Sequence, residues 1–245
     1  HLSSPTEDIS SNTIYVDYNY YLENVLYALA WQTNYVRTVP TNIDQAWINN
    51  AANYDVNSST SVREYTLISN ITYTLLENVT ISNNSCFILA GSEMTFDGSG
   101  HTIDISGVSG FNGLFQNGTV DISGQSDITI KNLGVLSTNG STLSDGAGWI
   151  GQQYFGKDVI NNKIENCYSE GAISASQAGG ICGSYTGSTG GNVTITNSYS
   201  LGAISASQAG GICGYDAGWN SGKVTVTNCY SAGSVSDINR GIFGS

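Results

Sequence analysis

Alternating apolar and polar residues mark most of the chain after residue 63. Residues 193–196 (VTIT) and 224–227 (VTVT) alternate with period two, the spacing of a strand that buries one face. Similar short strands are predicted at 65–70, 73–76, 79–82, 86–90, 94–97 and 102–106, with Gly, Asn and Ser residues between them. The repeated region has no amphipathic run of ten residues. An all-β arrangement of short strands and tight corners is therefore predicted.

This alternation lies inside an internal repeat. The twelve residues AISASQAGGICG at 172–183 recur at 203–214, and Asn166, Asn197 and Asn228 follow one another at intervals of 31 residues. A fainter copy places Asn132 34 residues before Asn166. Periods of ~20–50 residues are typical of solenoids and propellers, and short strands with glycine-bearing corners favour a parallel β-helix, here of about six coils.

In such a fold, equivalent residues of successive coils stack into columns about 4.8 Å apart. Two inward columns are predicted, and four asparagines are expected to form a hydrogen-bonded ladder at one corner. The columns are Ile181, Ile212 and Ile242, and Ile173, Ile204 and Val235; the ladder is Asn132, Asn166, Asn197 and Asn228.

The chain divides by pattern into three segments. Residues 1–38 are an aromatic N-terminal tail or cap, which either covers the end of the solenoid or docks on another subunit. Residues 39–62 hold a capping helix and a turn, with the helix expected over 40–52, Thr41 as N-cap, Asp44 in the first turn, and an apolar face that includes Trp47 and Ile48. Residues 63–245 form the β-helix, whose last coil shows no cap, so another chain covers it or the natural protein continues.

The charge balance excludes several partners. The formal net charge is −12, which argues against nucleic-acid binding and against docking on an anionic membrane. The longest apolar run, around 25–31, is far shorter than the ~20 residues that a membrane span needs. The chain begins with His1, and we expect an extracellular product from which a signal peptide has been removed.

The cysteines suggest neither a metal nor a cofactor. There are five, no two form a CxxC pair, and the chain has two histidines. Cys182 and Cys213 occupy equivalent places in adjacent coils and are a candidate disulfide; the alternative is a pair of small buried side chains stacked in a column. Cys86, Cys167 and Cys229 have no such partner.

Seven sequons permit N-glycosylation, about as many as this composition gives by chance. They are Asn57, Asn70, Asn78, Asn83, Asn117, Asn139 and Asn192.

Several motifs occur in a recognisable order. FDGSGHTIDISG at 96–107 precedes GLF at 113–115, ITIKNLGV at 128–135 and the copies of NCYSxGxIS and AGGICG. This order resembles the GLUG-type repeats of surface proteins, which include bacterial adhesins and giant-virus surface proteins. The resemblance implies a right-handed parallel β-helix and no particular activity. Gln116 departs from the pattern, which has Gly at that position.

Candidate catalytic chemistry is sparse. Asp97 and Asp104, with His101 between them, are the nearest pair of carboxylates for a polysaccharide-active enzyme, but Asp97 lies in a turn that favours Asp for backbone hydrogen bonding. The repeated coils carry few acids, so no catalytic residue is assigned and the protein is predicted to be non-enzymatic.

The predicted function is structural. We expect a protein of a cell or virion surface that assembles with itself into a fibre, with the N-terminal segment on the open C-terminal coil. The alternative is an adhesin that binds surface glycans through exposed aromatic side chains, for which the candidates are Trp149, Tyr154, Tyr185, Tyr215 and Trp219.

Overall fold

The computed structural model describes residues 41–236 and 241–244. The chain separates into two compact units, residues 1–39 and 40–245, and every described residue belongs to the second. The predictions for residues 1–38 therefore lie outside the described residues.

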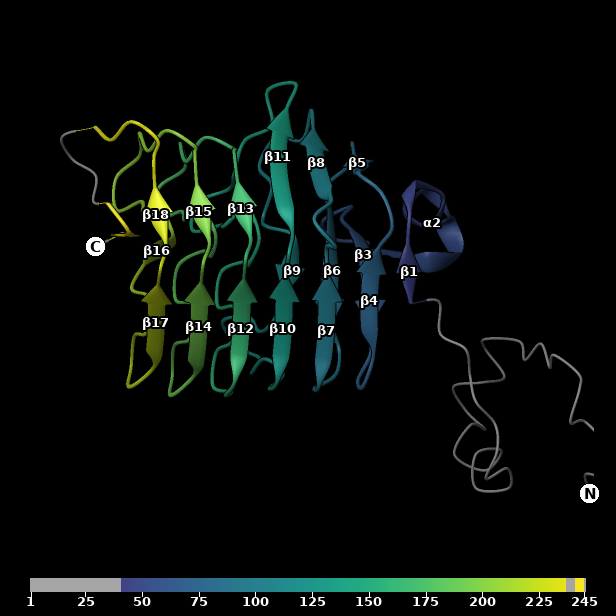
Figure 1. The fold of residues 1–245 in the computed structure, drawn as a ribbon, viewed down its shortest axis with the longest axis horizontal. Helices are drawn as coiled ribbons and strands as arrows, with labels where there is room; N and C mark the ends of the chain where they lie inside the picture. The colour runs from purple at the N-terminus through teal and green to yellow at the C-terminus, as the bar shows by residue number, and fades with distance from the viewer. Residues whose placement is uncertain (1–40, 237–240, 245) are drawn as a thin grey trace, which may run out of the picture. The chain divides into compact units, whose positions relative to one another are not determined.

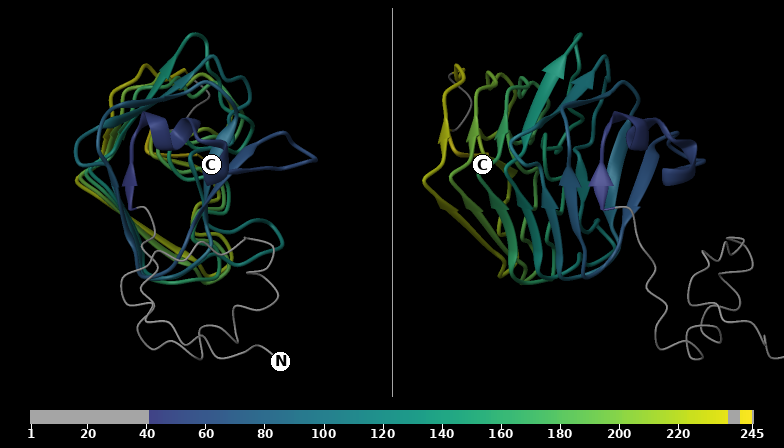
Figure 2. Two further views of the ribbon diagram at one scale, coloured as in Figure 1. Left: turned by 90° about the vertical axis from the view of Figure 1, so that its right-hand side faces the viewer. Right: turned by 45° about the vertical axis from the view of Figure 1, so that its right-hand side comes forward.

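The described unit is a parallel β-helix of about six coils. In Figure 1 the chain climbs the near face of each coil, returns behind it, and advances by one strand position per turn, which is the right-handed sense. Figure 2 shows the coils superposed when they are viewed along their stacking direction. The predicted fold class is confirmed.

Two long parallel sheets meet along one corner of the coil. The first contains β1 (Asn42–Ile43), β4 (Thr72–Leu75), β7 (Met94–Asp97), β10 (Ile128–Lys131), β12 (Asn162–Glu165), β14 (Asn192–Thr196) and β17 (Lys223–Thr227). The second contains β5 (Val79–Ile81), β8 (Thr102–Ser106), β11 (Gly134–Thr138), β13 (Tyr168–Ser169), β15 (Tyr199–Ser200) and β18 (Tyr230–Ser231).

The remaining strands close the coil on its other side. They are β2 (Asp55–Val56), β3 (Arg63–Leu67), β6 (Ser85–Leu89) and β9 (Phe115–Gln116) in one sheet, and β16 (Cys213–Tyr215) and β19 (Phe243–Gly244) in another. The β2–β3 pair is antiparallel, and the other strand pairs of these sheets are parallel.

The 31-residue repeat fixes the register of the later coils. Ile164 pairs with Ile195, and Ile195 with Val226, so identical positions of the repeat lie directly over one another. Because side chains alternate across a strand, every second residue of these strands points into the core. The predicted columns are confirmed by pairing between Ile173, Ile204 and Val235 and by backbone hydrogen bonds that join Ile181 to Ile212 and Ile212 to Ile242.

Aromatic rings fill the core of the first coils. Phe87 lies within 5.2–5.4 Å of Tyr65, Phe96 and Phe115, measured between ring centroids. These four side chains are no more than 1% exposed. Such rings bury large areas and pack edge to face or offset, so the first coils have a broad, dense interior.

A short helix covers the first coil. The expected helix over 40–52 was too long: α2 spans Gln45–Asn49, and a 3-10 turn, η1, follows at Ala51–Asn53. Its N-cap is Asp44 rather than Thr41, because β1 pairs with β4 and keeps the preceding residues extended. Tyr65 Oη donates to the carbonyl of Ile48 at 2.7 Å, and the rings of Trp47 and Tyr65 are 5.2 Å apart, so the helix is attached directly to the aromatic core.

Candidate functional site

The corner between the two long sheets carries a ladder of asparagine amides. Asn166 Nδ2 donates to Asn132 Oδ1 at 3.2 Å, Asn197 Nδ2 to Asn166 Oδ1 at 3.2 Å, and Asn228 Nδ2 to Asn197 Oδ1 at 3.3 Å. All four residues have φ between 49° and 53°, the left-handed region that Asn tolerates better than other non-glycine residues. The repeat therefore places the same corner conformation and the same amide contact in each coil.

The ladder ends on a carboxylate. Asn132 Nδ2 donates to Asp97 Oδ1 at 3.0 Å, and the same oxygen accepts from the Ser99 amide at 2.9 Å. The second oxygen, Oδ2, lies 3.3 Å from Lys131 Nζ. Burial by itself would raise the pKa of Asp97, but the hydrogen bonds from Asn132 and Ser99 and the charge of Lys131 outweigh it and lower that pKa.

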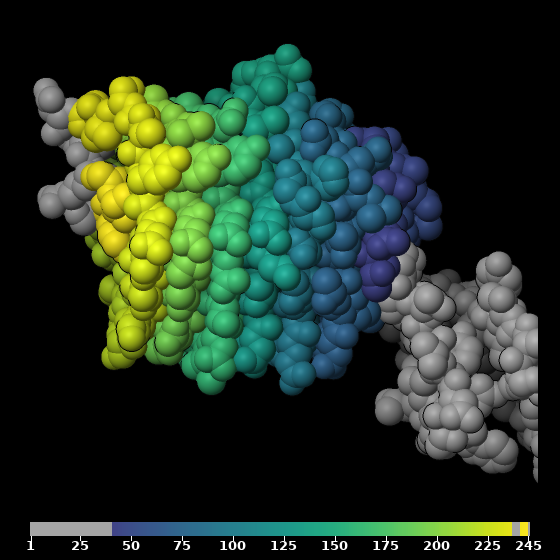
Figure 3. Space-filling model, in the orientation of Figure 1, coloured from purple at the N-terminus to yellow at the C-terminus, as the bar shows by residue number. Residues whose placement is uncertain are grey.

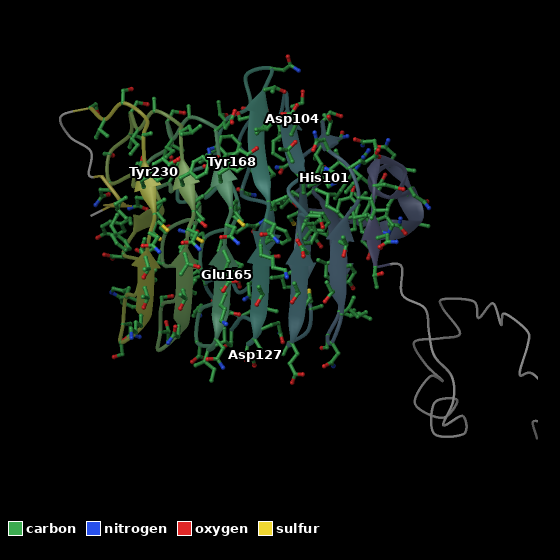
Figure 4. All side chains as sticks on the ribbon, viewed as in Figure 1. His101, Asp104, Asp127, Glu165, Tyr168 and Tyr230 are labelled. Carbon is green, nitrogen blue, oxygen red and sulfur yellow. The ribbon has the colours of Figure 1, made fainter. Side chains whose placement is uncertain are left out.

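These contacts limit what Asp97 and Asp104, the candidate carboxylate pair, could do in catalysis. A carboxyl group with a lowered pKa is ionised at neutral pH and is a poor general acid. Asp104 Oδ2 accepts from Thr138 Oγ1 at 2.8 Å, and Asp104 Oδ1 is buried with no hydrogen-bond partner among the described residues. Figure 4 labels Asp104 on the second sheet and His101 at the corner that precedes β8. Both carboxylates are thus held by neighbouring side chains of the scaffold.

Beside the ladder, a row of tyrosines follows the second sheet. The rings of Tyr168 and Tyr199 are 5.1 Å apart and 5° from parallel, and those of Tyr199 and Tyr230 are 5.0 Å apart and 3° from parallel. A side chain at Gly134 would clash with the Tyr168 ring, so the row begins over a glycine. Figure 4 labels the two ends of the row, Tyr168 and Tyr230. Within the row the ring faces cover one another, whereas Tyr230, the last ring, is 51% exposed.

A second aromatic group lies on other turns of the coil. The rings of Tyr154 and Tyr185 are stacked 5.0 Å apart at 9°. Tyr215 and Trp219 meet Tyr185 edge-on, at centroid distances of 6.0 and 6.1 Å. Trp219 is 53% exposed, and the three tyrosines are half-buried. Four of the five aromatic residues proposed for binding therefore form one connected group.

The fifth, Trp149, was wrongly expected at the surface. Its side chain is 0% exposed, stacks on Phe111 at 5.9 Å and donates from Nε1 to the carbonyl of Gly171 at 3.0 Å. A side chain at Gly171 would occupy the position of the indole. The core holds this tryptophan because another coil supplies both the space and the acceptor for its N–H group.

All five cysteines are free thiols, so the candidate disulfide between Cys182 and Cys213 is not formed. The two residues pair in register on parallel neighbours, where their side chains point the same way and stack. Burial raises the pKa of Cys167 and Cys182 to about 12, and Cys86 reaches about 12 as well. These thiols pack as small apolar side chains and are poor nucleophiles at neutral pH.

The sequons differ in exposure. Asn70, Asn78, Asn83 and Asn139 are exposed, and Asn57 and Asn192 are half-buried. Asn117 is 1% exposed, and its amide bonds the backbone of Gln125 through both Nδ2 (3.1 Å) and Oδ1 (2.6 Å). Asn117 is therefore no glycosylation site in the folded protein, because its amide nitrogen is enclosed.

In the part of the chain that the structure describes, no group of three or more His, Cys, Asp or Glu side chains could hold a metal ion. Within the same residues, no helix has the length and apolar character needed to cross a membrane.

Comparisons of the chain with protein-family models, with curated proteins and with solved structures give no match.

Proposed function

We propose that this β-helix is a non-enzymatic structural protein of a cell or virion surface, and that its copies assemble end to end. Support comes from the regular columns: backbone pairs, core side chains, asparagine amides and tyrosine rings all repeat along one direction. The order of the motifs that resembles GLUG-type repeats supports an extracellular surface location. Such a scaffold is suited to length and rigidity.

The observation that carries the proposal is the open edge of the last coil. Among the described residues, no strand pairs with the far edge of β17, the last strand of the first sheet. Val235 is 48% exposed, although Ile204, its equivalent one coil earlier, is 1% exposed. Figure 3 shows this coil, in yellow, at one end of the described unit. Unpaired strand edges beside apolar side chains favour pairing with another chain.

At the opposite end of the described unit, the proposed end-to-end contact would meet a different surface. There α2 lies over the first coil, and its own residue Ile48 is 2% exposed. A head-to-tail contact would thus join the open last coil to the edge of β1 and the outer surface of α2, rather than to a second open core. The expected contribution of residues 1–38 to this contact lies outside the described residues.

The test is a pair of matched substitutions read by sedimentation velocity and electron microscopy over a concentration series. Val235→Lys places a charge on the open end, whereas Leu201→Lys places one at an apolar side chain of similar exposure, 42%, on the flank of the coil. We expect the parent protein and L201K to form end-to-end oligomers with rising concentration, and V235K to associate at least about tenfold more weakly. A parent protein that stays monomeric throughout, or equal behaviour of the two variants, would overturn the proposal.

The weaker alternative is a polysaccharide-active enzyme. The contacts of Asp97 speak against it, since both of its carboxylate oxygens are engaged by Asn132, Ser99 and Lys131, and one oxygen of Asp104 is engaged by Thr138. Turnover of any member of a polysaccharide panel, lost in both D97N and D104N, would support this alternative instead.

A further inference from the structure

A hollow opens beside the second aromatic group. It has a volume of about 500 Å³ and lies between the loop at residues 118–120 and the coil surface that carries Tyr154. Its chemistry comes from four amide side chains, one carboxylate and one ring: Asn112, Gln116, Gln152, Gln153, Asp145 and Tyr154. Small-molecule sites have volumes of ~300–1,000 Å³, so the hollow could hold a ligand of one or two sugar rings.

The loop that forms one wall is fixed by several hydrogen bonds. Lys157 Nζ donates to the carbonyl of Val120 at 2.7 Å, and Ser123 Oγ donates to Asp158 Oδ2 at 2.8 Å. The buried amide of Asn117 holds the loop at its base through the backbone of Gln125. The wall is therefore preformed, which reduces the entropy lost when a ligand binds.

Tyr154 supplies an aromatic surface in an unusual backbone conformation. Its φ is +64°, and that of Tyr185, the tyrosine that stacks on it, is +57°. Bulky side chains rarely adopt this left-handed conformation, which costs about 1–3 kcal/mol, although many other non-glycine residues of this β-helix also have positive φ. Tyr185 covers one face of the Tyr154 ring, and the ring lines the hollow.

The polar groups of the hollow are oriented before any ligand arrives. Gln152 Nε2 donates to the carbonyl of Gly113 at 2.9 Å, and Gln153 Nε2 donates to Ser184 Oγ at 2.9 Å. Asp145 Oδ1 accepts from the Ser176 amide at 2.9 Å. Burial, followed by the nearby Tyr185 and Asp121, raises the pKa of Tyr154, so its hydroxyl remains protonated and can donate.

The charge of the hollow selects the ligand class. Among the described residues, no Lys, Arg or His lines it, and the Asp145 carboxylate is the one charged lining group. An anionic ligand would meet the Asp145 carboxylate with no cationic side chain among the lining residues. A pyranose combines an apolar ring face, which suits stacking on an aromatic ring, with hydroxyls that suit amide and carboxylate partners.

We propose that this hollow is a binding site for a neutral saccharide, with Tyr154 as the stacking platform and Gln152, Gln153 and Asp145 as hydrogen-bonding groups. The site is separate from the open end of the last coil. The saccharide proposal can therefore hold or fail independently of end-to-end assembly. One shallow site gives weak affinity, with dissociation constants in the millimolar range, and repetition of the site along an assembly would add avidity.

The test is titration of the isotope-labelled full chain with maltose, cellobiose, lactose and N,N′-diacetylchitobiose, followed by NMR chemical shifts, with glucuronic acid as the charged probe. We expect at least one neutral probe to saturate shifts at Gly118, Thr119 and the side-chain amides of Gln152 and Gln153. We expect glucuronic acid to bind at least about tenfold more weakly, a difference of about 1.4 kcal/mol.

Three variants separate binding from folding. Tyr154→Gly removes the ring and suits the positive φ, so its melting temperature should stay close to that of the parent while affinity falls at least about tenfold. Asp145→Asn retains the acceptor for Ser176 and should weaken binding several-fold. Tyr230→Ala changes an exposed tyrosine elsewhere and should leave affinity unchanged. Absence of saturable shifts, shifts confined to the Tyr168–Tyr230 row, or full affinity in Y154G would overturn the proposal.

Discussion

At the scale of single residues, Asp97 is the position where two kinds of interaction meet. It accepts the last amide of the asparagine ladder and faces Lys131, which in turn pairs in register with Glu165 on the next strand. Its ionised form is the one that these neighbours stabilise, which is why its pKa is lowered. The residue therefore links the stability of the ladder to pH.

We predict that Asp97→Ala destabilises the protein by about 1–2 kcal/mol at pH 7, because hydrogen bonds to a charged group are lost. A carboxyl group with a lowered pKa stabilises the fold fully above its unfolded pKa, and this contribution disappears as pH falls through the folded value. The penalty should therefore shrink on going below pH ~3.9, the ordinary pKa of Asp. Urea unfolding at pH 7 and at a pH below the ordinary pKa of Asp measures this penalty. Substitution of an exposed residue, Asp55→Ala, is the control. A penalty that is constant with pH would contradict the assignment.

At the scale of elements, each corner of the coil combines a backbone requirement with a side-chain contact. Asn197 has φ of +49°, donates to Asn166 and accepts from Asn228. Glycine would meet the first requirement without the second, and alanine would meet neither. The ladder asparagines therefore serve the fold in two separable ways.

Substitution of Asn197 should separate the backbone requirement from the side-chain contact. We predict that Asn197→Gly lowers the free energy of unfolding by about 1–2 kcal/mol through the loss of two amide hydrogen bonds. Asn197→Ala should lose about 1 kcal/mol more, because an L-residue with a Cβ is disfavoured at positive φ. Denaturant titration of both variants at pH 7 provides the comparison. Equal stability of the alanine and glycine variants would show that the corner conformation carries no cost.

At the scale of the whole described unit, stability depends on neighbouring coils. Each coil of a solenoid contacts only the coils before and after it, so an end coil has half the contacts of a central one. The first coil has α2 and an aromatic core over it, whereas β17 has no strand partner on one side among the described residues. Local opening should therefore begin at the last coil.

Hydrogen exchange followed by mass spectrometry should detect this asymmetry. We predict that amides of β17–β19 exchange at least about tenfold faster than those of β10–β14 at low protein concentration, since terminal elements open at lower free energy. The difference should diminish as concentration rises and the open edge becomes paired. Uniform protection along the chain at low concentration would argue against nearest-neighbour stability.

The repeating part of the structure could be predicted from the amino-acid pattern alone. A period of 31 residues brings Asn166, Asn197 and Asn228 to one column, and the same reasoning predicted Ile173 beneath Ile204. These features follow from local periodicity, because a stack of coils converts equal spacing along the chain into direct contact. Little else is needed to derive the register.

Features that depend on contacts between different sides of a coil emerged from the folded structure and not from the pattern. Trp149 is buried because Gly171 leaves room for it, and Asn117 is enclosed because Gln125 folds back over it. The shift of the helix start to Asp44 follows from the pairing of β1 with β4, and the hollow at Tyr154 exists because a distant loop forms its wall. Apart from the β1–β4 pairing, which continues the first sheet, these contacts do not repeat along the chain. Their formation depends on the shape of the folded coil, which a pattern of apolar and polar residues does not specify.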